Sequence, residues 1–284
     1  MTAAINHRAA RITHPGPRAA VRRHVVPGIA RRETVRLAAG RVLMDAVADE
    51  MDRLGCDSAV LLLDGLRLGP YDYVMPRFGS PDGIRVAWYS DTHSGNATTL
   101  AHAVASVGRR DGAWFLHCHA LWDVDTPAPK SGHLLPDQVT IGRDCDVTAL
   151  AFTGGVFDFT PDDETRFSFF RAKPTTPPAG TPNAMIATLA PFEDLVTVMP
   201  ELAAPYGGDA ARLYGLGSVI GADFSEGPSM ESLASEVLTL PDASPRNVTL
   251  HCVDPDGNLF RGALLLGAGP VLITFELMLV APGV

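Results

Sequence analysis

The sequence predicts an α+β fold in which one unit, a helix followed by strands, occurs twice. Three observations support this: helical periodicity early in each half, short apolar runs of strand composition after it, and paired motifs that recur in the same order. The 284 residues suffice for two domains of about 100–150 residues each. A composition of 46% apolar and 19% charged residues excludes wholesale disorder.

The first 36 residues are predicted to form an Arg-rich arm. They hold eight Arg and one acid, so their charge is 8 − 1 = +7 and the rest of the chain carries −9 − 7 = −16. The breakers His14-Pro-Gly-Pro17 and Pro27-Gly28 exclude a continuous helix there. Because an acidic body repels phosphate backbones, nucleic acid is an unlikely partner except through this arm, and docking on a neighbouring subunit is the simpler role.

The cysteines and the apolar runs indicate a cytoplasmic protein with no membrane contact. Four cysteines are scattered without a CxxC pair, which is typical of a reducing compartment. No run approaches about 18 uninterrupted apolar residues, and the N-terminus lacks the apolar core of a signal peptide.

The first domain is predicted over residues 37–172. Leu43, Val47, Met51 and Leu54 recur on one face of a helix, and Gly55 is suited to end it. The strands predicted to follow are 59–63, 84–89, 114–121 and 146–152.

A proline-rich linker over 173–184 is predicted to precede the second domain, which spans 185–284. The linker has four prolines within residues 173–182. A second helix is predicted near 192–204, where Pro200 must kink or divide it. The strands predicted after it are 248–253, 259–266 and 271–280.

Three histidines in the first half carry the main functional signal. Side chains alternate on a strand, so His117 and His119 share one face and Cys118 points to the other. A turn-rich segment follows, and a hairpin would return His133 beside them. Three imidazoles with an open fourth position are typical of a catalytic zinc site. Spacing alone leaves open the alternative of hydrogen-bonded core histidines, and imidazole also suits other divalent transition metals.

The second half repeats the motif order of the first but has lost two of the histidines. His251 remains, whereas Val253 and Ala263 stand where His119 and His133 are expected. One imidazole does not hold a metal, so the second domain is either structural or covers the site of the first. Cys118 and Cys252 occupy equivalent places and are predicted to be small core residues.

Further polar residues are candidates for catalysis or substrate binding. Asp91 or His93 is a candidate general acid or base, and Tyr89 a candidate hydrogen-bond donor to substrate. The alternative is a simple turn at a strand end. Glu276 is a candidate to supply a carboxylate across a domain interface, with a solvated glutamate as the alternative. Candidates to bind a substrate carboxylate are Arg77, Arg85, Arg109 and Arg110, although Arg109-Arg110-Asp111-Gly112 also fits a hairpin turn.

The H-x-H strand followed by Gly132-His133-Leu-Leu resembles the plants-and-prokaryotes-conserved (PPC) domain. In the second half, residues 191–195 (PFEDL) and 213–221 (LYGLGSVIG) resemble the helix start and a strand end of that domain. The chain departs from the family at Gly40-Arg41, where an acid usually follows the glycine, and in the missing histidines.

This resemblance implies two tandem copies of a twisted, mainly antiparallel sheet packed with a helix, and self-association as a trimer. The same superfamily includes α-acetolactate decarboxylase, a tandem of two such units with zinc on three histidines. That likeness implies His117, His119 and His133 as metal ligands and a small-molecule substrate that undergoes decarboxylation, enolisation, or ester or lactone hydrolysis. The alternative is a PPC-type DNA-binding or regulatory oligomer, although the AT-hook of plant members is not found here.

Overall fold

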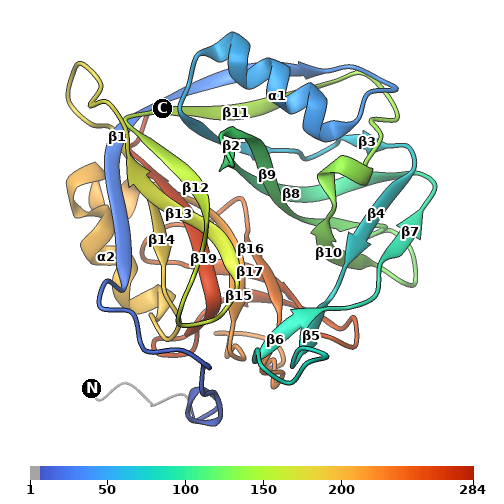
Figure 1. The fold of residues 1–284 in the computed structure, drawn as a ribbon, viewed down its shortest axis with the longest axis vertical. Coiled ribbons are helices and arrows are strands. Elements are labelled where there is room, and N and C mark those ends of the chain that lie inside the picture. Colours follow the sequence, from blue (N-terminus) through green and yellow to red (C-terminus); the bar gives the residue numbers. More distant parts are fainter. Residues whose placement is uncertain (1–6) are drawn as a thin grey trace.

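The computed structural model describes residues 7–284 as two stacked, mainly antiparallel β-sheets with a helix on the outer side of each. Helix α1 (Leu43–Leu54) covers the first sheet and α2 (Leu195–Ala203) the second (Figure 1). Antiparallel pairing with few helices agrees with the predicted α+β class. Among the described residues, neither helix has the length and apolar character needed to cross a bilayer.

The first sheet has the hydrogen-bonded order β1-β11-β2-β8-β9-β10, with every neighbouring pair antiparallel. The bounds of these strands are β1 Arg23–Leu37, β2 Ser58–Leu62, β8 Thr98–Arg110, β9 Ala113–Trp122, β10 Lys130–Leu134 and β11 Cys145–Thr153. The shorter strands around this sheet are β3 Arg67–Leu68, β4 Tyr71–Val74, β5 Pro76–Phe78, β6 Ala87–Tyr89, β7 His93–Gly95, β12 Gly155–Pro161 and β13 Ser168–Pro174.

The second sheet has the order β14-β19-β15-β16-β17-β18, again antiparallel throughout. Its strands are β14 Ala184–Leu189, β15 Arg212–Val219, β16 Glu236–Thr239, β17 Thr249–Val253, β18 Leu259–Ala263 and β19 Val271–Val280. In each sheet the helix follows the first strand in the sequence. A later strand then lies between the first two: β11 lies between β1 and β2, and β19 lies between β14 and β15. Most strands lie within one or two residues of their predicted ranges, but the strand predicted from position 84 begins only at Ala87 and the one predicted to 266 ends at Ala263.

Strand β1 belongs to both sheets. Its first part pairs with β14, and from Ile29 onward it pairs with β11. A Cβ on Gly28, at the crossing, would lie 2.3 Å from the Phe152 ring and from a backbone oxygen, so glycine is needed there. Residues 23–36, which the sequence prediction placed in an N-terminal arm, therefore lie in a core strand. Pro27-Gly28 excludes a helix but permits a strand that changes partner.

The helices begin and end where local chemistry favours it. Helix α1 has the predicted range, and Gly55 ends it in the left-handed conformation at φ 61°. Helix α2 begins three residues later than the prediction from position 192, because the Asp194 side chain accepts a hydrogen bond from the Thr197 amide at 2.9 Å and caps it. Pro200 lies inside α2.

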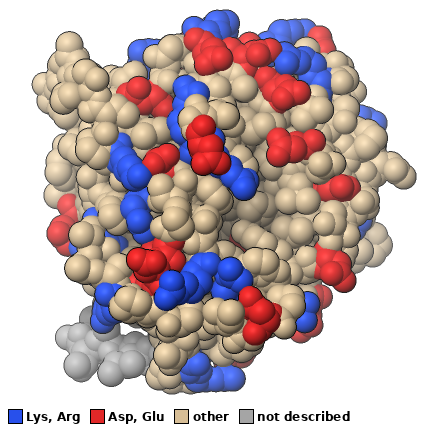
Figure 2. Space-filling model, in the orientation of Figure 1, with Lys and Arg blue, Asp and Glu red and all other residues tan. Residues whose placement is uncertain are grey.

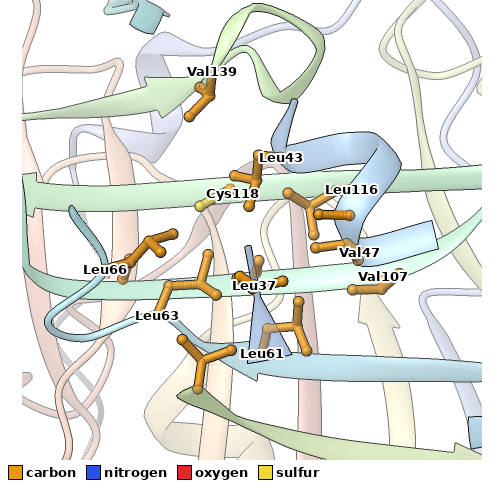
Figure 3. Close-up of a cluster of buried hydrophobic side chains, with 14 of the residues drawn as sticks. Leu37, Leu43, Val47, Leu61, Leu63, Leu66, Val107, Leu116, Cys118 and Val139 are labelled. Atoms are coloured by element: carbon orange, nitrogen blue, oxygen red, sulfur yellow. The ribbon is translucent and has the colours of Figure 1, made fainter. Parts of the chain in front are cut away.

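Three apolar layers hold these elements together. Two lie between a helix and its sheet, and the third lies between the sheets. Cys118 belongs to the first layer, among leucine side chains from several elements (Figure 3), and Cys252 to the second. Both thiols are fully buried, so their predicted role as core residues is confirmed.

Residues 8–16, which precede β1, pack on their own chain. The Arg8 guanidinium pairs with Asp223 at 2.9 Å and with Glu231 at 2.6 Å, both in the second half. Ile12 enters a small apolar cluster with residues of that half. A Cβ on Gly16 would lie only 1.6 Å from the Asp163 carbonyl oxygen, so the backbones are in close contact. These contacts hold residues 8–16 against the second half of the same chain.

A buried histidine links the two sheets. His102 on β8 has Nδ1 3.0 Å from the Asp64 carboxylate, and its Nε2 donates to the Thr239 carbonyl at 2.8 Å across the interface. Burial alone would lower the pKa of His102, but the Asp64 carboxylate outweighs burial and the pKa is raised above 6.5.

Replacing His102 with Gln is expected to destabilise the protein in a pH-dependent way. A pKa raised on folding contributes stability that is present in full below pH 6.5 and is lost as the pH rises through the folded pKa. The His102→Gln variant should lose about 1–2 kcal/mol in urea denaturation at pH 5.5 and less at pH 8.5. An equal loss at both pH values would contradict the charged link.

Candidate metal centre

The three predicted histidines meet on one face of a β-hairpin. His117 and His119 lie on β9, and His133 on β10 pairs directly with His119. The ring centroids are 4.7 Å apart for His117–His119 and His117–His133, and 5.3 Å apart for His119–His133. One nitrogen from each ring lies within 4.8 Å of the others. The hairpin predicted from the spacing is therefore present.

Two small residues ahead of His133 allow β10 to lie where it does. The Ser131 hydroxyl donates to the Ala120 carbonyl at 2.8 Å and joins β10 to β9. A Cβ on Gly132 would lie 2.8 Å from the Val74 carbonyl oxygen on β4, which pairs with the other edge of β10. The Gly-His dipeptide thus fits a strand held closely on both sides.

The second sheet contributes two carboxylates to the same point. Glu276 on β19 is fully buried, and its Oε2 lies 2.9 Å from His117 Nδ1. Glu236, the first residue of β16, has Oε2 2.7 Å from His119 Nε2. The interface position considered for Glu276 is therefore the observed one. Sequence analysis missed Glu236. The feature that could have pointed to it is an acidic residue directly before the short apolar run Val237-Leu238.

Hydrogen bonds fix which ring nitrogens carry protons. His119 Nδ1 donates to the Val237 carbonyl at 2.8 Å, since a carbonyl can only accept, and His117 Nδ1 donates to Glu276 when that carboxyl is ionised. In the neutral rings both Nε2 atoms therefore hold lone pairs, yet they lie 3.0 Å apart, and one faces the Glu236 carboxylate. Two lone pairs and a carboxylate around one point attract a cation: a proton or a metal ion.

The pKa values follow from burial and from these neighbours. Burial, with His119 nearby, lowers the pKa of His117 to about 3, and burial also holds the pKa of His133 well below 6.5. Burial opposes the charge of His119 too, but Glu236 outweighs it and raises the pKa of that ring. Burial raises the pKa of Glu276 to about 8. The cluster keeps two of its imidazoles neutral, the form in which they bind metals.

A cavity of about 430 Å³ opens onto the cluster. His117, His133, Glu236 and Glu276 line one part of it, while His119 lies behind them, 1% exposed. The other lining residues include seven aromatic side chains, several small and aliphatic ones, and three arginines: Arg85, Arg110 and Arg166. The cavity can therefore hold a small organic molecule against the imidazoles.

The other predicted catalytic residues divide into two groups. Tyr89 lines the cavity, and its ring centroid lies 5.2 Å from that of His133. Asp91 and His93 do not line it: both are exposed, and the His93 ring stacks on Tyr73 at 5.1 Å. The turn at the end of β6 carries these two residues away from the histidines.

The candidate arginines divide in the same way. Arg85 and Arg110 line the cavity, whereas Arg77 and Arg109 do not. Arg109 instead stacks over the Trp114 ring at 3.4 Å, next to the hairpin turn that joins β8 and β9. Arg166, which sequence analysis did not single out, also lines the cavity.

Comparisons with known proteins give weak matches. Neither a protein-family profile nor a curated protein sequence matches the chain. A metal-containing protein from Archaeoglobus fulgidus is similar in structure at 16% identity and a TM-score of 0.40, and the match covers 51% of this chain and 95% of that one. A PPC protein from Pyrococcus horikoshii is similar at 14% identity and a TM-score of 0.37, with coverage of 50% and 93%.

A third similar structure, from Ralstonia eutropha, is provisionally named a DNA-binding protein. It has 17% identity and a TM-score of 0.39, and the match covers 48% of this chain and 88% of that one. One of the three is thus a PPC protein, the family that the sequence resembles, and none of them has an enzyme name. Identities and TM-scores this low transfer no activity to the chain.

Proposed function

We propose that the chain holds one divalent metal ion, most simply zinc, on His117, His119 and His133, and that it is a metal-dependent enzyme. Its substrate is a small carboxylate or carbonyl compound, and the reaction is decarboxylation, enolisation, or hydrolysis of an ester or lactone. The observation that carries this proposal is the convergence of three imidazoles and a carboxylate at the end of a cavity.

The donor set fits such an ion. Two zinc–nitrogen bonds of tetrahedral geometry separate their nitrogens by about 3.3 Å, and the Nε2 atoms of His117 and His119 lie 3.0 Å apart. Both rings donate their other N–H to an acceptor, as metal-binding histidines usually do. Nδ1 of His133 is buried and has no hydrogen-bond partner among residues 7–284. No other hydrogen bond therefore ties this ring to an orientation that would keep it from binding a metal ion.

A bound zinc ion supplies Lewis acidity, which polarises a carbonyl or carboxylate oxygen. The chain's own groups do the rest. Glu236 lines the cavity, and its Oε2 lies 2.7 Å from His119 Nε2; a cation held on that nitrogen would keep the carboxylate ionised and able to accept a proton. Glu276 orients His117, and Tyr89 offers a hydroxyl group to a substrate in the cavity.

We also infer that the two halves are tandem copies of one unit. The support is that both sheets have the same strand order, with the helix at the same point in the chain. In this view residues 37–172 form the domain that binds the metal and residues 185–284 a degenerate domain that covers it. The connection 173–184 joins β13 to β14.

The alternative function is that of a PPC-type DNA-binding or regulatory oligomer, and the names of the similar structures lie nearer to it than to an enzyme. The charge distribution argues against it. Five of the eight arginines in residues 1–36 form ion pairs with carboxylates of the same chain. Acidic and basic side chains alternate on the face drawn in Figure 2, without a continuous basic surface.

Purified protein is expected to contain about one zinc ion per chain, and His119→Ala should reduce this to near zero, because two imidazoles hold the ion far more weakly than three. Elemental analysis of protein never exposed to chelator measures it. The control is His251→Ala, a buried strand histidine of the second half, which should keep its metal. Negligible metal in the unaltered chain would overturn the proposal.

Glu276→Gln is expected to weaken zinc binding about 10–100-fold, because an amide orients His117 less strongly than a carboxylate and balances no charge. Competition with a chromogenic chelator measures the affinity. Exposed Glu226→Gln serves as the matched control and should leave the affinity unchanged. Equal affinities in both variants would show that Glu276 has no influence on the ion.

The full chain is expected to leave DNA unretarded in a gel mobility assay even at low salt, because its net charge is −9. Truncation to residue 36 is a poor test, since it removes most of strand β1. Retardation that weakens steeply with salt would favour the DNA-binding alternative.

A further inference from the structure

The cavity has a basic group at the end remote from the histidines. On the hairpin of β8 and β9, Ser106 pairs with His117 and Arg110 pairs with Ala113. Side chains alternate along a strand, so Arg110 lies on the same face as Ser106 and His117, four residues or about 13 Å along the strand. Both Arg110 and His117 line the cavity.

Arg110 is the cavity arginine whose charge is left unbalanced. Arg85 pairs with Asp82 at 3.3 Å, and Arg166 pairs with Asp163 at 3.7 Å. Within residues 7–284, no carboxylate forms an ion pair with Arg110. Its guanidinium lies instead over aromatic rings, 5.2 Å from the Phe115 centroid and 4.9 Å from that of Phe159. Arg110 is also exposed at this end of the cavity, so its N–H groups face solvent and are free for an anion.

An aromatic wall connects the two ends of the cavity. Phe115, Phe159 and Phe170 come from three different strands, and all three line the cavity. Their ring centroids are 5.1 to 6.0 Å apart, with interplanar angles between 64° and 88°. Edge-to-face contacts of this kind favour an added aromatic ring over a flexible aliphatic chain.

We infer that the substrate is an elongated aromatic acid whose anionic group binds Arg110 while its ring packs on Phe115, Phe159 and Phe170. Its other end, a carbonyl or carboxylate, then reaches the imidazoles, and this part rests on the proposed function. The anionic group, the ring and the carbonyl or carboxylate of such a substrate match, in order, the guanidinium, the aromatic wall and the imidazoles along the cavity.

The test compares two probes that differ only in the distal anion. Phenylacetate carries one carboxylate, and 4-carboxyphenylacetate adds a second at the opposite end of the ring. Calorimetric titration of the purified full chain in buffer that contains zinc should show about tenfold tighter binding of the second probe, the size expected of a charge-assisted hydrogen bond. Pimelate, an aliphatic dicarboxylate of similar length, should bind more weakly than 4-carboxyphenylacetate.

Arg110→Met keeps an unbranched chain over the rings and removes the charge. It should bring the two affinities to within about twofold while leaving phenylacetate binding unchanged. Arg109→Met is the matched control: this neighbour stacks on Trp114 away from the cavity, and the tenfold difference should persist. Arg85→Met should also preserve the difference.

The outcomes separate this inference from the proposed function. A difference that survives Arg110→Met, that is lost in Arg85→Met, or that never appears would overturn the inference, even if each chain carries its zinc. Pimelate binding as tightly as the aromatic diacid would overturn the aromatic class. If elemental analysis finds no zinc but the difference still depends on Arg110, the inference stands and the metal-dependent function fails.

Discussion

The stacking of the two sheets on one shared apolar layer is the constraint on which the candidate site depends. The hairpin of β9 and β10 presents three imidazoles on the face turned toward the second sheet, and β16 and β19 bring two carboxylates to the same point. Neither sheet contains the site alone. Strand β1 hydrogen-bonds to both sheets and so helps to fix their relation, which positions the imidazoles of one against the acids of the other.

Burial gives this arrangement its chemical character. A buried carboxylate without a positive partner is costly, and Glu276 meets the cost by holding a proton up to a pKa of about 8. Glu236 remains ionised because His119 takes up a proton beside it. A divalent cation at the same point would replace that proton and balance both acids, since it would be the largest local charge. The cluster is thus suited to a cation, and protons are the simplest one it can take up.

The sequence predicted the parts of this site that lie close together in the chain. The spacing of His117 and His119 and the turn before His133 indicated a hairpin, and the periodicity of α1 gave its bounds. The meeting of Glu236 with the histidines was not predictable, because the two segments are more than a hundred residues apart and only sheet stacking joins them. Strand β1 was missed for a related reason: Pro27 and Gly28 looked like breakers, although they mark the change of partner.

The two halves contribute different side chains to one cavity. In the first sheet, β9 and β10 hold the three imidazoles. In the second sheet, Val253 pairs with Leu259 and Ala263 pairs with Thr249, so the two residues predicted to replace His119 and His133 do not face each other as those histidines do, and the carboxylates come from β16 and β19. His251 remains, but burial lowers its pKa to about 4, so it stays a neutral core residue. With imidazoles on one sheet and acids on the other, a single cavity is walled by both, and its remote end is left free for Arg110 and the aromatic rings.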